Sequence, residues 1–571
     1  MKRLLSYLKS YKWLIFVGPF FKLVEAVFEL LNPILVAQIV DVGVANLDSA
    51  YIIKMGLIIL VINVVGFCCN LISQKCASLT SVGVATKIRK DMFQKISTFS
   101  HSELDKFGTA SLVNRLTNDI NQVESAISNF MRLLIRVPFL LIGAFVLSLV
   151  INKMMSLVFL FLIPVVTIIL VIYMKKTVPY FKQIREKLDT VSKVTKENLS
   201  GTRVIRAFNK QEDEQKRFEG VSADYTNTSI HVSKITALLN PLVFLIADAA
   251  ILTLLIVGGW QINIGGMKQG DIIALINYVS IITISLVLFS HIIVMIVRTA
   301  ASLHRIDEVM NTTPSITDKL DAKPIKKSNY DALMEFNNVC FNYSLTANEK
   351  SFIKDLSFKI YPHQTIGIIG GTGSGKSTIA HLMTRFYDVT NGEILYKGVN
   401  IKDYPVKQLR DEISIVQQRS TLFSGSLKEN MTIRAEATDE EIIEALKISQ
   451  AWGFVSEWRD PLNYQIMAGG KNVSGGQMQR LTIARALIGN PEMIILDDSS
   501  SALDFLTDSN LRKSLKKLNC TTVLISQRAT SIKNADLIIV LDNGDVVGMG
   551  KHEQLLKNCE IYKEIYDSQS K

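Results

Sequence analysis

Long apolar runs fill residues 1–300, whereas residues 336–571 alternate short apolar runs with polar and charged positions. A membrane-spanning helix needs about 20 largely apolar residues. The segment must be a helix because lipid offers no water to its backbone N–H and C=O groups, and a helix bonds these groups to one another. The pattern therefore predicts six spanning helices, at residues 13–40, 52–74, 131–151, 155–174, 238–262 and 271–297.

The charge between these runs predicts their orientation. Lys and Arg cluster before the first run and after the second, fourth and sixth runs. The other connections contain only two basic residues, Lys153 and Lys268; these connections are residues 41–51, 152–154 and 263–270. Cytoplasmic loops collect positive charge, so both termini are expected in the cytoplasm and the chain in the plasma membrane.

The two long cytoplasmic connections, residues 75–130 and 175–237, have a helical composition with few helix breakers. About 25 helical residues span about 37 Å. We therefore expect the membrane helices to continue into the cytoplasm and to turn near Ser102–Ser111 and Arg203–Glu214. Such turns are rigid levers that can touch a cytoplasmic domain.

Several charged residues interrupt the apolar runs, among them Lys22, Glu25, Glu29 and Asp248. Charge facing lipid is costly, so these side chains are expected to face the bundle interior or a wet cavity. Lys22, Glu25 and Glu29 share a helix face. They form either a patch that contacts substrate or protons, or an internal ion pair. Asp248 has no obvious local partner, which favours a functional role.

The composition excludes some classes of protein. The net charge of the chain is +11. In the first half the Lys and Arg residues cluster beside the apolar runs, as they do next to membrane helices, so the charge does not indicate a nucleic-acid partner. The six cysteines form no CxxC or Cys/His metal spacing, so neither a disulfide framework nor a zinc site is indicated.

The second half contains a phosphate-binding loop of the pattern G-x-x-x-x-G-K-[ST]. An apolar run at residues 365–369 predicts a strand before it, and residues 378–386 predict a helix after it. Backbone N–H groups and the helix N-terminus favour phosphate here, with Lys376 on the β and γ phosphates and the Ser377 hydroxyl on Mg²⁺. The expected ATP-binding residues are Gly370, Gly371, Thr372, Gly373, Ser374, Gly375, Lys376, Ser377 and Thr378.

A second apolar strand, residues 493–497, ends in Asp497 and is followed by Asp498. Downstream of a phosphate loop, a strand that ends in Asp holds Mg²⁺ through water, as in the Walker-B arrangement. The sequence therefore predicts a membrane all-α six-helix domain fused to a soluble α/β P-loop ATPase domain. The predicted boundaries are 1–310 for the membrane domain, 311–335 for a linker, and 336–571 for the nucleotide-binding domain.

Residues 473–480 are Val-Ser-Gly-Gly-Gln-Met-Gln-Arg and resemble the LSGGQ signature of ABC transporter ATPases. They lie between the two Walker motifs, as in that family. The order of elements along essentially the whole chain is similar to that of a B-type exporter half-transporter. The resemblance implies that the signature completes an ATP site on a second subunit, through Ser474, Gly475, Gly476 and Gln477.

The resemblance implies three further roles. Tyr343 matches the aromatic residue that stacks on adenine. Gln418 matches the glutamine that senses Mg²⁺ and contacts the membrane levers, although Gln417 beside it leaves the register open. Residues 501–504, Ser-Ala-Leu-Asp, match the D-loop, which crosses to the opposite subunit.

Three positions depart from the family pattern. Ala468 stands where the family's X-loop usually has Glu, a change expected to alter the coupling of the ATPase domain to the levers, and the other two belong to the catalytic set. Asp498 stands where the family usually has Glu to polarise the attacking water, and Gln527 stands where it usually has His in the switch loop. The carboxylate of Asp is retracted by about 1.5 Å, and a misplacement of about 1 Å can cost about 100-fold in rate. Gln has no proton that titrates near neutral pH. With Gln418, these are the expected catalytic residues of a weakened site.

The sequence thus predicts one half of an ATP-driven exporter of amphipathic drugs, lipids or peptides. We expect a heterodimer with a second half-transporter, in which this chain provides the degenerate ATP site. A homodimer with slow hydrolysis and an ATP-gated membrane regulator that does not pump remain alternatives.

Overall fold

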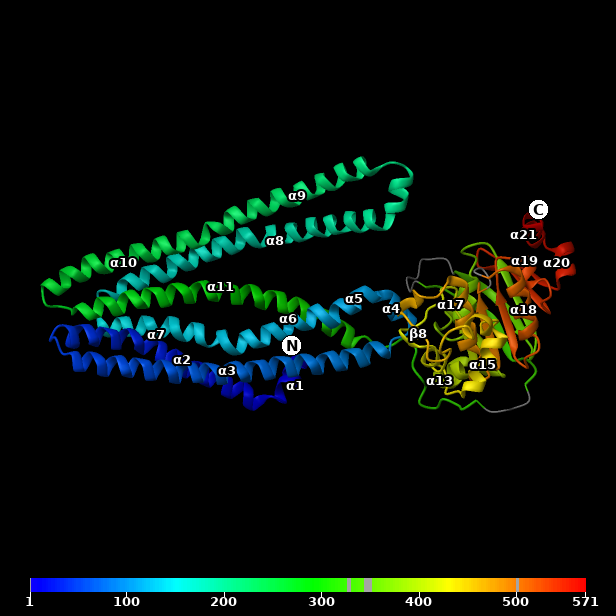
Figure 1. Ribbon diagram of the computed structural model, residues 1–571, viewed down its shortest axis with the longest axis horizontal. Coiled ribbons are helices and arrows are strands. Elements are labelled where there is room, and N and C mark those ends of the chain that lie inside the picture. The colour runs from blue at the N-terminus through cyan, green and yellow to red at the C-terminus, as the bar shows by residue number, and fades with distance from the viewer. Residues whose placement is uncertain (1, 326–329, 344–351, 500–502, 571) are drawn as a thin grey trace. The chain divides into compact units, whose positions relative to one another are not determined.

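The computed structural model describes residues 2–325, 330–343, 352–499 and 503–570. The chain forms two compact units (Figure 1). The first holds Met1–Ser97 and Ala110–Thr312, and the second holds Thr98–Thr109 and Thr313–Lys571. The second unit thus takes in a short segment from within the membrane half of the sequence.

The first unit is built from helices, and its core lies where they face one another. Its α-helices are α1 (Lys2–Lys9), α2 (Lys12–Gln38), α3 (Ser49–Ser97), α5 (Thr109–Asn114), α6 (Ile120–Asn129), α7 (Arg136–Ile151), α8 (Ser156–Ala207), α9 (Gln211–Ala237), α10 (Leu239–Asn263) and α11 (Gln269–Asn311). Three π-helical segments join some of them: η1 (Ile39–Val44), η2 (Arg115–Asp119) and η3 (Phe130–Leu134).

Five helical segments of the described chain are long and apolar enough to cross a membrane. They are Ser49–Ser97, Thr109–Ile151, Ser156–Ala207, Gln211–Asn263 and Gln269–Asn311. The protein is therefore a multi-pass membrane protein. The first predicted span is the helix α2, but Lys22, Glu25 and Glu29 lie along its middle and it is not among the five. Six spans thus stay a prediction.

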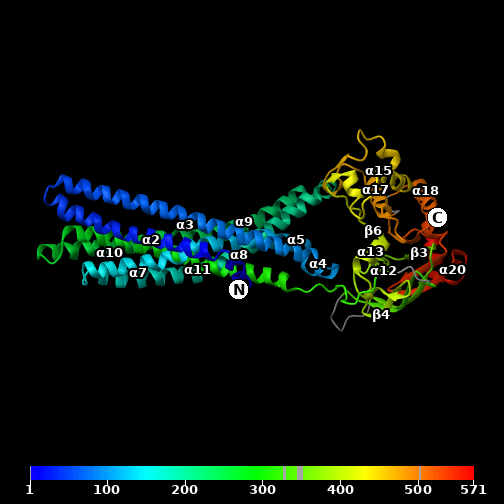
Figure 2. The ribbon, with the colours of Figure 1, turned by 90° about the horizontal axis from the view of Figure 1, so that it is seen from below.

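The long helical connections are confirmed. α3 has 49 residues and α8 has 52, more than a bilayer requires. α8 and α9 run side by side as a hairpin, which Figures 1 and 2 both show. The first connection turns between Ser97 and Thr109, and the second between Ala207 and Gln211, close to the predicted turns.

The charged residues of α2 form internal ion pairs. The Lys22 ammonium lies 2.5 Å from a carboxylate oxygen of Glu25 and donates to the side-chain oxygen of Asn70 on α3 at 2.9 Å. Arg136 on α7 lies 2.6 Å from a carboxylate oxygen of Glu29. Of the two open interpretations, the internal ion pair is the one that the geometry supports, because each of the two carboxylates on this face has a cation beside it.

Asp248 does not face the interior of the bundle of this chain, so of its two expected places only a wet cavity stays a prediction. α10 buries Val243, Ala247, Ala250 and Leu254, a face with helical spacing of three and four residues. Asp248 lies off this face and is exposed.

The described residues of the second unit form three sheets, and the two larger ones contribute apolar side chains to its core. A four-stranded antiparallel sheet has the order β2-β1-β4-β5, and a six-stranded sheet has the order β12-β11-β3-β10-β9-β6, with β7-β8 as a small pair. The strands are β1 (Met334–Phe341), β2 (Ile353–Ile360), β3 (Thr365–Gly370), β4 (Asn391–Tyr396), β5 (Val399–Asn400), β6 (Ile413–Val416), β7 (Gly425–Ser426), β8 (Gln465–Ile466), β9 (Met493–Asp497), β10 (Thr521–Ile525), β11 (Leu537–Asp542) and β12 (Asp545–Gly550).

In the larger sheet β11, β3, β10, β9 and β6 run parallel, and β12 is antiparallel. β3 and β9 are nearly continuous apolar runs that are buried along almost their whole length, as parallel strands covered on both faces are. Both predicted strands are thus confirmed. The sheet brings the carboxyl ends of β3, β9 and β10 to one edge.

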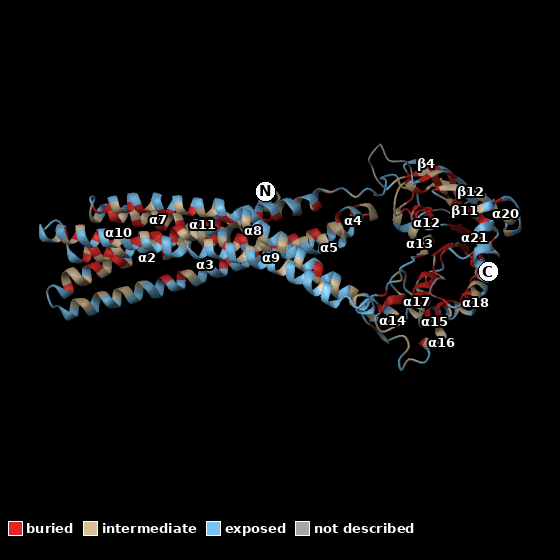
Figure 3. Ribbon diagram, turned by 90° about the horizontal axis from the view of Figure 1, so that it is seen from above, coloured by how far each residue is buried: buried red, intermediate tan, exposed pale blue. Residues whose placement is uncertain are grey.

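Helices surround these sheets, and Figure 3 shows buried positions gathered where they meet. They are α4 (His101–Phe107), α12 (Lys376–Met383), α13 (Val406–Glu412), α14 (Leu427–Met431), α15 (Asp439–Ile448), α16 (Trp452–Val455), α17 (Gly475–Leu487), α18 (Phe505–Leu515), α19 (Ala529–Ile532), α20 (His552–Asn558) and α21 (Glu560–Ser570), with 3₁₀ turns η4 (Ile401–Asp403) and η5 (Ala468–Gly470). α12 starts two residues before the predicted helix and ends earlier than predicted, ahead of Arg385, whose φ is +50°.

Candidate nucleotide site

The predicted phosphate loop connects β3 to α12, the strand–loop–helix context that the motif requires. Gly370 ends β3, and a Cβ there would lie 2.2 Å from the carbonyl oxygen of Leu541. Gly373 and Gly375 have φ of +82° and +102°, which favour glycine. The loop therefore requires glycine for two reasons: a side chain would collide with the backbone at Gly370, and the backbone conformation disfavours other residues at Gly373 and Gly375.

The loop has the properties of an anion cradle. A Cβ at Gly371 or Gly373 would meet nothing within 4 Å, so the loop backbone is open to a ligand. The hydroxyl of Ser374 is buried and has no hydrogen-bond partner among the described residues. A buried hydroxyl without a partner is costly. The loop therefore fits a ligand that brings oxygen acceptors, as a phosphate chain does.

Lys376 is the first residue of α12 and is buried. Its ammonium donates to the carbonyl oxygens of Gly370 and Gly371, at 2.9 and 2.6 Å. Burial lowers the pKa of Lys376, while the nearby carboxylates of Asp498 and Asp497 act in the opposite direction. The cation is thus enclosed within the loop that is predicted to hold phosphates.

Asp497 and Ser377 form the candidate Mg²⁺ site. Asp497 is buried at the end of β9, and burial raises the pKa of its carboxyl, while a hydrogen bond with the Ser377 side chain lowers it. Magnesium ions prefer hard oxygen ligands and usually keep several waters. One carboxylate and one hydroxyl beside a phosphate loop match that donor set. Mg²⁺ at these residues stays a prediction, like the other site roles.

Asp498 and Gln418 are hydrogen-bonded, so the structure brings together two of the three expected catalytic residues. The Gln418 amide donates to an Asp498 carboxylate oxygen at 3.4 Å. Burial raises the pKa of Asp498, whereas the positive charges of Lys376 and Arg528 lower it. Arg528 was not singled out from the sequence, and its place beside Asp498 depends on the pairing of β9 with β10.

The third expected catalytic residue, Gln527, follows β10, and its backbone N–H donates to the Asp498 carboxyl. Its side chain is exposed. We call Ser526–Ala529 the switch segment. Its local geometry is fixed in part by Ser526, whose hydroxyl oxygen accepts a 3.0 Å hydrogen bond from the N–H of Arg528. The Asp498 carboxyl and the backbone of Gln527 thus lie at the same edge of the sheet.

Tyr343 lies next to the phosphate-loop helix. Its hydroxyl is 2.9 Å from that of Thr378, and its ring makes edge contacts with Phe341, Phe352 and Tyr387. The side chain is 47 % exposed, which leaves part of the ring available for stacking. This placement is compatible with the predicted contact with adenine.

The signature residues begin α17. Ser474 caps this helix: its hydroxyl accepts from the N–H of Gln477, and the Gln477 side chain accepts from the N–H of Ser474 at 2.8 Å. A Cβ at Gly475 would meet nothing within 4 Å, and Gly476 follows it in the first turn. The helix therefore presents an open N-terminus, which favours an anion.

The predicted D-loop lies only partly within the structure. Ser501 and Ala502 lie outside the described residues. Asp504 caps α18, because its carboxylate accepts from the N–H of Thr507 at 2.9 Å.

A contact that the sequence did not predict in detail lies in the second unit, where α4 packs on α12 and the loop after it. The His101 ring stacks on Phe386 with centroids 4.1 Å apart. The Tyr387 hydroxyl donates to Asp105 at 2.5 Å. These partners are far apart in sequence, so no local pattern reveals them. The contact does show that a turn between membrane helices packs on the ATPase fold.

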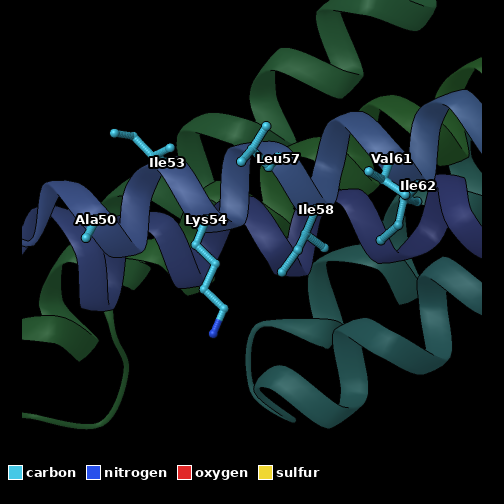
Figure 4. A pocket seen from close by; sticks show the side chains of 7 residues that line it. All are labelled: Ala50, Ile53, Lys54, Leu57, Ile58, Val61 and Ile62. Atoms are coloured by element: carbon cyan, nitrogen blue, oxygen red, sulfur yellow. The ribbon is translucent and has the colours of Figure 1, made fainter.

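A separate hollow of about 640 Å³ belongs to the first unit (Figure 4). All seven of its lining residues come from α3: Ala50, Ile53, Lys54, Leu57, Ile58, Val61 and Ile62. It is formed by the side of one largely apolar helix and has none of the nucleotide-site residues. We regard it as part of the lipid-facing surface.

The chain was compared with known protein families. Residues 15–286 match the ABC transporter transmembrane region, and residues 353–501 match the ABC transporter family. The second match contains the phosphate loop, the signature and the Walker-B aspartate. Each half of the sequence therefore resembles a different part of the same kind of transporter.

Individual relatives match along the whole chain. An uncharacterized ABC transporter ATP-binding protein of Bacillus subtilis, YfiB, is 33% identical over 578 residues, covering 100% of this chain and 98% of its own. The ATP-dependent lipid A-core flippase of Haemophilus ducreyi is 29% identical over 583 residues, covering 100% and 97%.

The fold has a close counterpart among solved structures. A bacterial Atm1-family ABC exporter with ATP bound matches with a TM-score of 0.78 at 19% identity, covering 100% of this chain and 99% of that one. This likeness shows the exporter fold. Together with the family matches and the full-length relatives, it identifies the chain as a member of the ABC transporter family, an ATP-coupled transporter with its membrane and ATPase domains in one polypeptide.

Proposed function

We propose that this chain is one half of a heterodimeric ATP-driven exporter and that it provides the weaker of two ATP sites. One observation carries the proposal. Asp498 and Gln527, the two residues of the catalytic set that depart from the family pattern, lie at one edge of the sheet, where the backbone N–H of Gln527 bonds the Asp498 carboxyl and lowers its pKa. Both substitutions therefore affect the same reaction centre.

The remaining residues of the site are suited to bind ATP. The nucleotide supplies the phosphoanhydride bond whose hydrolysis releases the free energy for transport. In this chain the loop N–H groups and Lys376 bind its phosphates, Tyr343 stacks on its base, and Ser377 with Asp497 binds Mg²⁺. Binding is therefore expected to be retained.

Hydrolysis at this site is expected to be slow. A general base must reach the proton that it takes, and Asp498 is one methylene shorter than Glu. Its carboxylate is also engaged by the Gln418 amide and the N–H of Gln527. The Gln527 side chain can donate a hydrogen bond to a phosphate oxygen, but it carries no titratable proton.

The signature is the second contribution of this chain. Ser474, Gly475, Gly476 and Gln477 form a capped and open helix N-terminus, where the dipole and free N–H groups favour a phosphate. In the proposed heterodimer this surface completes the ATP site of the partner. The partner then supplies the glutamate and histidine that this chain lacks.

The membrane half is proposed to move an amphipathic compound, such as a drug, a lipid or a peptide, out of the cytoplasm. The lipid A-core flippase among the relatives supports this class. The basic residues at the predicted cytoplasmic connections support cytoplasmic termini in the plasma membrane. α4 packs on the ATPase fold, which supports a lever that transmits closure of the ATPase domains to the helices.

Purification of the tagged full-length chain, expressed at its natural level, tests the proposal. We expect a second, different half-transporter to copurify, and ATP hydrolysis to require it. Fast hydrolysis by this chain alone would instead support a homodimer. A complex that binds and hydrolyses ATP but moves no amphipathic dye into inverted vesicles would support a regulator that does not pump.

A further inference from the structure

The switch segment receives two hydrogen bonds from a distant helix. The Gln569 amide on α21 donates to the carbonyl oxygen of Gln527 at 2.7 Å. The side-chain oxygen of Gln569 accepts from the N–H of Ala529 at 2.8 Å. One planar amide thus binds an acceptor and a donor of the same short segment, which restricts its orientation more than a single bond would.

The bond to Ala529 has a specific structural role. Ala529 is the first residue of α19, and the first N–H groups of a helix have no partner within it. Arg528, at the N-cap position, makes no side-chain cap hydrogen bond. Gln569 therefore caps α19 from another helix.

α21 is anchored independently of Gln569. Tyr562 on α21 is fully buried and packs in one cluster with Ala529 and Ile532 of α19. Its hydroxyl is 2.8 Å from the imidazole Nδ1 of His552 on α20. α21 contacts both α19 and α20, and the three helices lie at the same end of the ATPase fold (Figure 1). Because buried residues such as Tyr562 hold α21 in place, the position of the Gln569 amide does not depend on its own bonds to the switch segment.

Gln527 is consequently bound on both sides of its own backbone. Its N–H donates to the Asp498 carboxyl, and its carbonyl oxygen accepts from Gln569. These two bonds fix the peptide groups before and after the residue, and so the direction in which its side chain leaves the backbone.

We propose that Gln569 is a positioning residue of the nucleotide site, which fixes the backbone of the switch segment and thereby directs the Gln527 side chain. The inference rests on the role of Gln527 given under the proposed function. It adds that α21 is coupled to the nucleotide site, so that a displacement of this helix alters the switch segment without contacting the nucleotide.

Amide hydrogen exchange of the full-length protein in lipid nanodiscs, with and without MgATP, tests this proposal. Without nucleotide, Gln569→Ala is expected to speed exchange of the Ala529 N–H about five-fold, the effect of one lost hydrogen bond. Gln569→Glu keeps an oxygen that accepts from Ala529 but loses the donor to the Gln527 carbonyl, so it is expected to protect the Ala529 N–H better than Gln569→Ala does. Ser568→Ala is the matched control, because its hydroxyl donates to the Ile565 carbonyl within α21.

With MgATP, the switch segment of the wild type is expected to gain protection, and Gln569→Ala is expected to lose that gain while the phosphate loop stays protected. Unchanged exchange of the switch segment in Gln569→Ala, or an equal effect of Ser568→Ala, would overturn the inference. Failure of MgATP to protect the phosphate loop of the wild type would count against the proposed function instead, because the nucleotide-free arm tests Gln569 by itself.

Discussion

The backbone N–H of Asp498 donates a 2.9 Å hydrogen bond to the carbonyl oxygen of Ile525, which joins the ends of β9 and β10. Asp498 has a φ of +47°, a conformation that is uncommon outside glycine, and this bond helps to maintain it. The position of the carboxylate is therefore set by the strand pairing. A longer side chain at the same place would extend from the same fixed backbone.

We predict that the double variant Asp498→Glu and Gln527→His hydrolyses ATP about 10- to 100-fold faster at this site than the wild type. Glu restores the missing methylene, and His restores a group that titrates near neutral pH. Phosphate release by the full-length complex measures the rate, in a complex whose other site has been inactivated.

The same double variant with Lys376→Ala is the control and should show no gain. No acceleration in the intact double variant would mean that Asp498 and Gln527 are not what limits hydrolysis.

We predict that Tyr343→Ala weakens ATP binding about five- to ten-fold, because an aromatic stacking contact contributes about 1 kcal/mol. Tyr343→Phe keeps the ring and loses the hydroxyl contact with Thr378, so its affinity should stay within about two-fold of the wild type. Equilibrium binding of a fluorescent ATP analogue measures both. Equal affinities of the alanine variant and the wild type would show that Tyr343 only packs against its aromatic neighbours.

The packing of α4 is predicted to weaken at acid pH. Burial lowers the pKa of His101, and the positive charge of Arg410 adds to this effect, while Asp105 opposes it. Burial also lowers the pKa of His381, whose ring lies 6.3 Å from that of His101. Both imidazoles therefore bind protons less readily in the packed state than when α4 separates. The stabilisation is complete above the ordinary pKa of 6.5 and declines as the pH falls below it.

Amide exchange of residues 98–109, corrected for the intrinsic effect of pH, measures this packing. Protection is expected to fall between about pH 7.5 and about pH 5.5 in the wild type. It should stay nearly constant when His101 and His381 are both replaced by Phe, since Phe keeps an aromatic ring on Phe386. If protection of residues 98–109 falls with pH equally in the wild type and in the double Phe variant, the assignment to these histidines is refuted.

The ion pair between Arg136 and Glu29 is predicted to be costly to break on one side only. Arg136→Met leaves the Glu29 carboxylate without its cation and should lower the free energy of unfolding by about 2–4 kcal/mol, less than for a fully buried pair. Adding Glu29→Gln should recover most of this loss. Thermal unfolding of the wild type and of both variants in detergent measures these differences in stability.

Lys187→Met is the matched control, since Lys187 pairs with Asp224 on the exposed surface of α8 and α9. Its loss should cost less than about 1 kcal/mol. Equal costs for Arg136→Met and Lys187→Met would contradict the view that the pair within the bundle is special.

Local patterns predicted most of this architecture. The phosphate loop, the strand before Asp497 and the long helices depend on residues that are neighbours in sequence, so their periodicity and glycine spacing were sufficient. The end of α12 was misplaced because apolar residues continue past Arg385, where the backbone turns. The charge pattern on α2 was visible, but its partners Asn70 and Arg136 lie on other helices.

Contacts between distant segments were not predictable from the sequence. Asp105 and Tyr387 are 282 residues apart, and Gln569 is 42 residues from Gln527. Gln569 is an exposed polar residue near the end of a helix, and nothing in its neighbourhood marks it as a partner of the switch segment. Only the pairing of strands and the packing of α21 on α19 bring these groups together.

The ATPase rate of the assembled complex with one altered residue in this chain tests the central claim most directly. Gly475→Asp is suited to the test, because a Cβ there meets nothing in this chain and Asp is favourable in the first turn of a helix. The account predicts that this variant, which places a negative charge at the partner's ATP site, removes nearly all hydrolysis, whereas Asp498→Asn leaves the rate within about two-fold of the wild type. Loss of hydrolysis in Asp498→Asn together with full activity of Gly475→Asp would contradict it.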